Sequence, residues 1–186
     1  MSRLGKKPIK IPKDVQVDIS GSILKFKGPK GESEYKMPVG IKIEKEENYL
    51  RVISPRKRKL ERINFGRTRA EIANIINGVN KGFKKRLELF GVGYSAKIEG
   101  DKLTMALGYS HPILLNKPND INVEINKNEI IISGINKENV GQFAAHIHDL
   151  KRAEPYKGKG FKYSDEVIKR KVGKAALKTE GEAAAK

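Results

Sequence analysis

The segment Tyr156–Tyr163 (YKGKGFKY) combines residue types that suit contact with a phosphate backbone. Ammonium groups come from three lysines: Lys157, Lys159 and Lys162. Gly158 and Gly160 lack side chains, so the backbone can approach a phosphate closely and donate its N–H groups. Three aromatic rings can stack on bases or pack against a ribose: those of Tyr156, Phe161 and Tyr163. The pattern favours nucleic acid. The alternative, in which the rings only anchor a surface loop, is compatible with it.

Other residues that could do chemistry lack the spacing that catalysis or metal binding requires. Gly91–Ala96 (GVGYSA) matches a loose dinucleotide-binding pattern, but strand-like sequence follows it instead of a helix, which indicates a tight bend. His146 and His148 lie two apart on an expected helix and so point in nearly opposite directions. The chain has no cysteine, which removes thiol chemistry and Cys-ligated zinc. We therefore expect no catalytic residue, no metal site and no cofactor.

The formal net charge of +17 is concentrated in four blocks, while the rest of the chain is slightly negative. The blocks are Met1–Lys10, Arg51–Arg69, Lys81–Arg86 and Lys151–Lys178. Clustered Lys and Arg indicate a polyanionic partner, most often nucleic acid. An anionic membrane fits less well because the C-terminal block lacks large apolar anchors. A merely solvated surface is the remaining interpretation.

The length of 186 residues fits one ordinary domain or two small ones. Aliphatic runs such as Ile130–Ile132 are far too short to span a membrane. Residues Met1–Ile11 lack the apolar centre of a secretory signal. We expect a soluble, cytoplasmic protein with no membrane partner and no small-molecule substrate.

The first half of the chain predicts two hairpins followed by a helix. Apolar residues occur at every second position in residues 15–26, around Ser20–Ser22, and in residues 41–52, around Glu46–Asn48. A single helical face then carries Ile72, Ile75, Ile76 and Val79. We expect this helix to end near Gly78–Gly82.

The second half repeats this order. Strand-like alternation occurs in residues 96–107 and 121–132, and a helix follows whose apolar face carries Val140, Phe143, Ala144 and Ile147. Asn136 or a neighbouring residue is expected to cap that helix. Several residues also match at an offset of 80, such as Gly28 with Gly108. The shared order indicates an internal duplication.

These patterns predict an α+β fold with two duplicated domains, each an antiparallel sheet packed by one helix, plus a basic C-terminal extension. We expect domains at residues 1–81 and 82–174, with a low-complexity tail at 175–186. We interpret the glycine-rich stretch Val79–Lys85 as the boundary between the two domains. Because Pro, Gly and Lys alternate in Tyr156–Tyr163, we expect an exposed loop there.

The chain resembles the universal uL-six family of bacterial large-subunit ribosomal proteins over nearly its whole length. Ser2–Ile9 (SRLGKKPI) is similar to the family's N-terminus, and Gly91–Tyr94 (GVGY) opens the second domain as it does in the family. Glu154–Gly160 (EPYKGKG) is similar to the family signature and is followed by the expected basic segment Val167–Lys174. Among these motifs the signature is the most specific.

The resemblance implies a structural role in translation, with large-subunit ribosomal RNA and neighbouring ribosomal proteins as partners. It implies that the second domain binds this RNA near the sarcin–ricin loop and the base of the acidic-protein stalk, where translational GTPases dock nearby. The first domain would face neighbouring components. A free-standing basic DNA- or RNA-binding protein is the alternative function.

We expect RNA contacts from the signature segment, the extension, the N-terminus and the first helix. The candidate residues are Lys151, Arg152, Tyr156, Lys157, Gly158, Lys159, Gly160, Lys162, Tyr163, Lys169, Arg170, Lys171, Lys174, Arg3, Lys6, Lys7, Arg67 and Arg69. Whether the Arg51–Arg69 block as a whole meets RNA or solvent stays open at this point, as does the role of residues 175–186.

Overall fold

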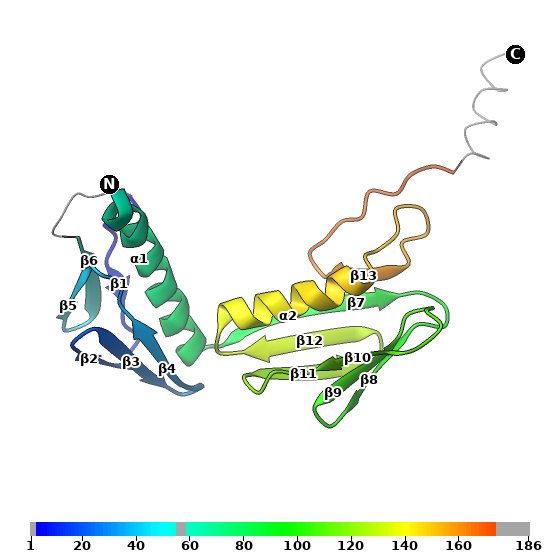
Figure 1. Cartoon of the computed structure of the whole chain (residues 1–186), viewed down its shortest axis with the longest axis horizontal. Helices are drawn as coiled ribbons and strands as arrows, with labels where there is room; N and C mark the ends of the chain where they lie inside the picture. The colour runs from blue at the N-terminus through cyan, green and yellow to red at the C-terminus, as the bar shows by residue number, and fades with distance from the viewer. Residues whose placement is uncertain (1–2, 55–58, 174–186) are drawn as a thin grey trace, which may run out of the picture. The chain divides into compact units, whose positions relative to one another are not determined.

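The computed structural model describes residues 3–54 and 59–173, which fold into two compact units (Figure 1). The first unit contains the chain up to Phe83 together with Gly134–Asn139, and the second contains Lys84–Ser133 and the chain from Val140 onward. Each unit has antiparallel strands and one main helix, so the expected α+β class with two repeats is confirmed. The expected basic residues 56–58, Lys174 and the tail 175–186 lie outside the described residues.

The first unit is built from two three-stranded sheets and a long helix. The first sheet has the order β2 (Gln16–Ser20), β3 (Ile23–Gly28), β4 (Gly31–Lys36), and the second has the order β1 (Ile9–Lys10), β6 (Tyr49–Ile53), β5 (Lys42–Glu46). The helix α1 (Lys59–Asn80) packs against β3, β4 and β6. Both expected hairpins are present, since β2 pairs with β3 and β5 pairs with β6. The sequence patterns did not predict β1 or β4.

The core of the first unit follows the apolar periodicity of its elements. Leu24 and Phe26 alternate on β3 and are at most 1% exposed. On α1 the residues Ile72, Ile76 and Val79 are at most 2% exposed, as one face of an amphipathic helix requires. The backbone N–H of Lys81 donates to the carbonyl of Asn77. The helix ends at Asn80, within the predicted range Gly78–Gly82.

The second unit has a four-stranded and a three-stranded sheet with one helix. The larger sheet has the order β11 (Ile121–Asn126), β12 (Glu129–Gly134), β7 (Phe83–Phe90), β13 (Gly160–Tyr163). The smaller sheet has the order β10 (Ile113–Asn116), β9 (Lys102–Ala106), β8 (Ser95–Glu99). Three of these strands, β7, β10 and β13, were not expected. Residues Gly91–Gly93 form the predicted bend between β7 and β8.

The helix α2 (Lys137–Leu150) matches the prediction closely. Its buried residues are Val140, Phe143, Ala144 and Ile147, the four that the periodicity selected. The side-chain oxygen of Asn136 accepts a hydrogen bond from the N–H of Glu138 at 2.9 Å, so Asn136 caps the helix. No helix in the described part of the chain is long and apolar enough to cross a membrane.

Two helical glycines are expected to respond to alanine in opposite directions. A Cβ at Gly78 would collide with the carbonyl oxygen of Ile135, whereas a Cβ at Gly141 would meet nothing within 4 Å. Gly78→Ala should lower the free energy of unfolding by about 1–3 kcal/mol, because the backbone around Ile135 must move. Gly141→Ala should raise it by about 0.5–1 kcal/mol through helix propensity. Urea unfolding followed by circular dichroism measures both, and shifts of the same sign would contradict the packing described here.

Candidate nucleic-acid interface

Residues Lys151–Phe161 form a turn that is closed by backbone hydrogen bonds. The N–H of Phe161 donates to the carbonyl of Lys151 at 2.7 Å, and the N–H of Ala153 donates to the carbonyl of Phe161 at 3.1 Å. At the tip, the N–H of Gly158 donates to the carbonyl of Glu154 at 2.9 Å. Gly158 has a φ of 71°, which favours glycine over any residue with a Cβ. The tip, Glu154–Lys159, is called the basic turn below, and its backbone path is well defined.

The expectation of an exposed loop over the whole of Tyr156–Tyr163 is wrong for its second half. Gly160–Tyr163 form β13, which pairs with β7 so that Phe161 lies opposite Leu89. The Phe161 side chain is fully buried. A Cβ at Gly160 would lie 2.6 Å from the carbonyl oxygens of Lys151 and Arg152. Phe161 therefore anchors the basic turn to the second unit, and Gly160 permits the close approach of the turn's two arms.

Lys162 and Tyr163 also have partners inside the second unit. The Lys162 ammonium lies 2.8 Å from a carboxylate oxygen of Glu88 and 4.8 Å from the centre of the Phe90 ring. The Tyr163 ring stacks on the His148 ring with centres 5.0 Å apart. Burial is the main cause that raises the pKa of Tyr163. Both side chains therefore contribute contacts that attach β13 to the rest of the second unit.

The basic turn and the extension that follows β13 come together in space. The backbone N–H of Lys171 donates to the carbonyl of Pro155 at 2.9 Å. The Arg170 guanidinium lies beside Gly158, 3.5 Å from the place a Cβ would occupy. Lys157 is exposed, as are Lys169, Arg170 and Lys171, whereas Lys159 is half-buried. Arg170 and Lys171 of the extension therefore lie against the basic turn, with Arg170 beside Gly158.

Tyr156, Lys151 and Arg152 flank this cluster in sequence but differ in their surroundings. The Tyr156 side chain is 54% exposed, so its ring is accessible for stacking. The Lys151 ammonium lies 4.7 Å from the centre of the Tyr109 ring. Arg152 forms an ion pair with Asp149 at 2.9 Å, and its hydrogen bond is the main cause that lowers the pKa of that carboxyl. Arg152 already has a carboxylate partner in this structure.

The remaining described candidates lie in the first unit. Arg3, Lys6 and Lys7 are exposed, and the Arg69 guanidinium donates to the carbonyl of Lys7 at 3.4 Å. The Arg67 guanidinium donates to Glu71 at 2.6 Å. This hydrogen bond is the main cause that raises the pKa of Arg67. Arg69 therefore ties the N-terminal segment to α1, and Arg67 has an acidic partner.

The sequence-based list omitted Lys85, which the fold brings next to the candidate residue Tyr163. Lys85 lies on β7, and its ammonium is 5.4 Å from the centre of the Tyr163 ring. The basic block Lys81–Arg86 was a usable signal, but most of it falls in Val79–Lys85, which was interpreted as the boundary between the domains. Strand β7 places this lysine next to β13.

The arrangement is that of a structural binding protein: a duplicated scaffold that carries an exposed cluster of cations and one open aromatic ring. Gly158 and Gly160, two of the expected contacts, are buried within the turn. Within residues 3–54 and 59–173, no three His, Asp or Glu side chains gather as metal ligands.

Comparison with known proteins identifies the family. The family model described as ribosomal protein L6 matches residues 11–82 and 90–164. A protein from Syntrophomonas wolfei named large ribosomal subunit protein uL6 is 48% identical over 179 residues, which is 96% of this chain and 100% of that protein. A protein of the same name from Persephonella marina has the same identity and coverage, and one from Clostridioides difficile is 48% identical over 180 residues.

The chain belongs to the ribosomal protein L6 family. It is therefore a structural protein of the large ribosomal subunit, located in the cytoplasmic ribosome, and not an enzyme. The two stretches matched by the family model include most of both repeats and reach to the end of β13.

Proposed function

We propose that the second unit binds large-subunit ribosomal RNA through the basic turn and the residues Lys169–Lys171. The observation that carries this proposal is the hydrogen bond from Lys171 to Pro155, since it joins two basic stretches into one surface. Exposed ammonium and guanidinium groups can neutralise adjacent phosphates. Gly158 and Gly160 are buried, and the N–H of Gly158 already donates to Glu154, so these glycines shape the turn instead of contacting a phosphate. The half-exposed Tyr156 ring offers a stacking platform for an unpaired base.

The proposed place of contact is the RNA near the sarcin–ricin loop and the base of the stalk. The protein would there support the region in which translational GTPases dock, while the first unit would contact neighbouring ribosomal proteins. The support is the similarity of Glu154–Gly160 (EPYKGKG), which contains the basic turn, to the family signature. RNA helices hide their base edges in a deep major groove, so recognition should rest on shape, 2′-hydroxyl groups and loops.

A single cysteine at the turn can test the location, because the chain has none of its own. Tyr156→Cys, labelled with an iron chelate that releases hydroxyl radicals, is incorporated into large subunits. The expected result is strand cleavage of the RNA confined to the neighbourhood of the sarcin–ricin loop, since radicals act close to their source. Primer extension over the whole large-subunit RNA maps the cuts.

The matched control is Lys97→Cys on β8, an exposed position of the same unit outside the basic turn. It should give a different cleavage pattern or none. Cuts from Tyr156→Cys at a distant RNA segment would refute the location, and absence of cuts in fully labelled subunits would refute the contact itself.

A further inference from the structure

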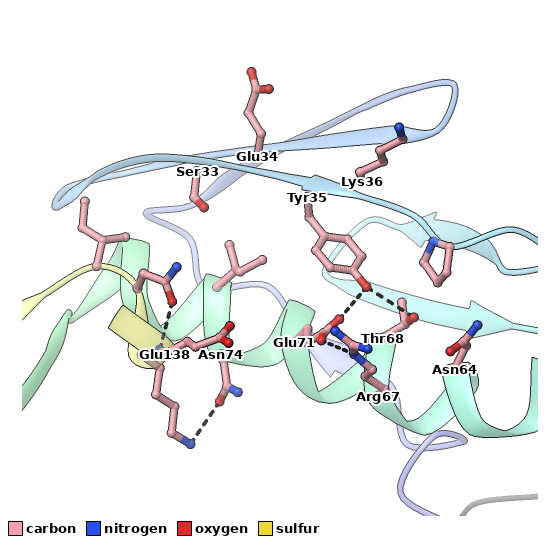
Figure 2. Close-up of a pocket in the computed structure, with 15 residues that line it drawn as sticks. Ser33, Glu34, Tyr35, Lys36, Asn64, Arg67, Thr68, Glu71, Asn74 and Glu138 are labelled. Atoms are coloured by element: carbon pink, nitrogen blue, oxygen red, sulfur yellow. Dashed lines mark hydrogen bonds and ion pairs between the residues drawn. The ribbon is translucent and has the colours of Figure 1, made fainter. Parts of the chain in front are cut away.

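The first unit contains a cavity of about 460 Å³ between β4 and α1 (Figure 2). Tyr35 points from β4 across this cavity, and its hydroxyl donates to Glu71 at 2.6 Å and lies 3.4 Å from Thr68 (Figure 2). Burial, followed by the hydrogen bond to Glu71, raises the pKa of Tyr35 to about 12. The cavity is therefore crossed by a neutral phenol that braces β4 against α1.

Strand β4 lies at the edge of its sheet, and β3 is its only partner strand within the described residues. The N–H of Met37 donates to the carbonyl of Ser22 at 2.8 Å, so Met37 and Ser22 form a hydrogen-bonded pair of the β3–β4 ladder. Hydrogen-bonded pairs alternate along an antiparallel ladder. The register pairs Lys36 with Ile23 and Glu34 with Lys25. The backbone N–H and C=O groups of Glu34 and Lys36 therefore point away from β3.

The cavity reaches this backbone edge. Its lining includes all four consecutive residues Ser33–Lys36, whose side chains alternate between the two faces of the sheet. At the opposite edge of the same sheet, the Lys45 ammonium donates to the carbonyl of Val17 on β2 at 2.6 Å. That edge also borders a cavity, of about 550 Å³. The cavity at β4 differs from it because α1 forms its other wall.

The two carboxylates of β4 pair with lysines of the neighbouring strand, whereas Lys36 is exposed at the same edge. Glu34 lies 3.2 Å from the ammonium of Lys25, and Glu32 lies 2.7 Å from that of Lys27. Charged residues often protect an edge strand from pairing. Here these ion pairs run across the sheet between β4 and β3, so the carboxylates do not extend beyond the edge.

The ionisable side chains that line the cavity balance each other. Three are cations and three are carboxylates: Lys36, Arg67, Lys137, Glu34, Glu71 and Glu138. A phosphate backbone requires an excess of cations, whereas the backbone of an extended peptide is neutral and offers both donors and acceptors. The lining therefore matches a polypeptide rather than RNA.

We propose that the free edge of β4 binds an extended segment of a partner protein, which adds a fourth strand to the sheet and lies in the cavity. Backbone hydrogen bonds to Glu34 and Lys36 supply the binding, and side chains of the segment enter the space between β4 and α1. The segment is uncharged overall, with polar groups that reach Asn64 and Asn74 on the cavity wall. This interaction is independent of the RNA contact of the second unit.

Proline at position 34 separates edge pairing from every other role of this surface. Glu34→Pro removes an N–H that points away from β3, so the β3–β4 ladder keeps its hydrogen bonds. Glu34→Ala is the matched control, because it removes the same carboxylate and keeps the N–H. In both variants Lys36 is replaced by the photoreactive residue benzoylphenylalanine, and the full-length protein is irradiated within large ribosomal subunits.

The expected product is a covalent adduct with one peptide segment of another protein, located by mass spectrometry. The reference is the protein in which only Lys36 is replaced by benzoylphenylalanine. Relative to it, the adduct yield should fall at least ~10-fold when Glu34→Pro is added and stay within ~2-fold when Glu34→Ala is added. An adduct with RNA, no adduct, or a yield that proline leaves unchanged would overturn the proposal.

Hydrogen exchange of the unaltered protein gives a second test. Amides of Glu34 and Lys36, the two that point away from β3, should exchange at least ~10-fold more slowly in subunits than in the free protein, and equal rates would overturn the proposal as well.

Discussion

Phe161→Ala should lower the free energy of unfolding of the second unit by about 3–5 kcal/mol, the range for removal of a fully buried phenyl ring. Phe161 is completely buried and sits on a strand of only four residues, so its loss leaves β13 with little apolar contact. Because β13 anchors the basic turn, the turn should also lose its fixed position. Urea unfolding followed by circular dichroism measures the stability, and hydrogen exchange of residues 151–163 measures the order of the turn.

Tyr156→Ala serves as the control for this prediction. Tyr156 lies in the same turn but is 54% exposed, so its removal should change the free energy of unfolding by no more than about 0.5 kcal/mol. If Phe161→Ala cost less than about 1 kcal/mol, the ring would not be the anchor described here. A large effect of Tyr156→Ala on stability would show that the exposed ring is part of the core.

The sequence predicted those parts of the fold that local periodicity encodes. The buried face of α2 was predicted residue by residue, because Val140, Phe143, Ala144 and Ile147 follow a helical repeat. The hairpins of β2 with β3 and β5 with β6 followed from apolar alternation on either side of short turns. Duplication of this order was enough to predict the fold class. These signals need no knowledge of distant contacts.

The missed strands lack such a local signal. On β4 the inward-facing residues are Ser33 and Tyr35, and only Tyr35 packs against the core, so the segment does not alternate between apolar and polar residues. Strand β13 contains only one fully buried apolar side chain, and it is paired with β7, more than seventy positions earlier in the chain. Such a pairing leaves no trace in a window of ten residues.

The same limit applied to the candidate site. The residue types of the signature segment pointed to phosphate contact, but Lys162 and Lys157 look equivalent in the sequence. Only the fold shows that Lys162 is 24% exposed and paired with Glu88, whereas Lys157 faces solvent. The approach of Lys171 to Pro155 was equally invisible, because it depends on how the extension folds back. The RNA contacts themselves stay a prediction.

Charge reversal at the basic turn and at the adjoining Arg170 should have the largest effect on RNA binding. The variant Lys157→Glu, Lys159→Glu, Arg170→Glu places three carboxylates where the structure gathers cations, and Lys162 is left unchanged because it already pairs with Glu88. If about 8 phosphates are neutralised in total, the slope of log K against log salt should be about −6 to −7. Removing three contacts should reduce the size of that slope by about 2–3 and weaken binding at least ~10³-fold near 0.1 M salt.

The effect must come from local contacts rather than from net charge, and a matched variant separates the two. Lys97→Glu, Lys102→Glu, Lys127→Glu reverses three exposed lysines of the same unit and lowers the net charge from +17 by the same amount. If the basic turn is the contact, this control should weaken binding to large-subunit RNA only modestly and keep the salt slope, because distant charges act through a screened field. Equal losses in the two variants, measured by filter binding over a range of salt, would mean that the protein binds RNA through diffuse attraction. A loss confined to the turn variant would instead assign the binding energy to the surface that the Lys171–Pro155 hydrogen bond holds together.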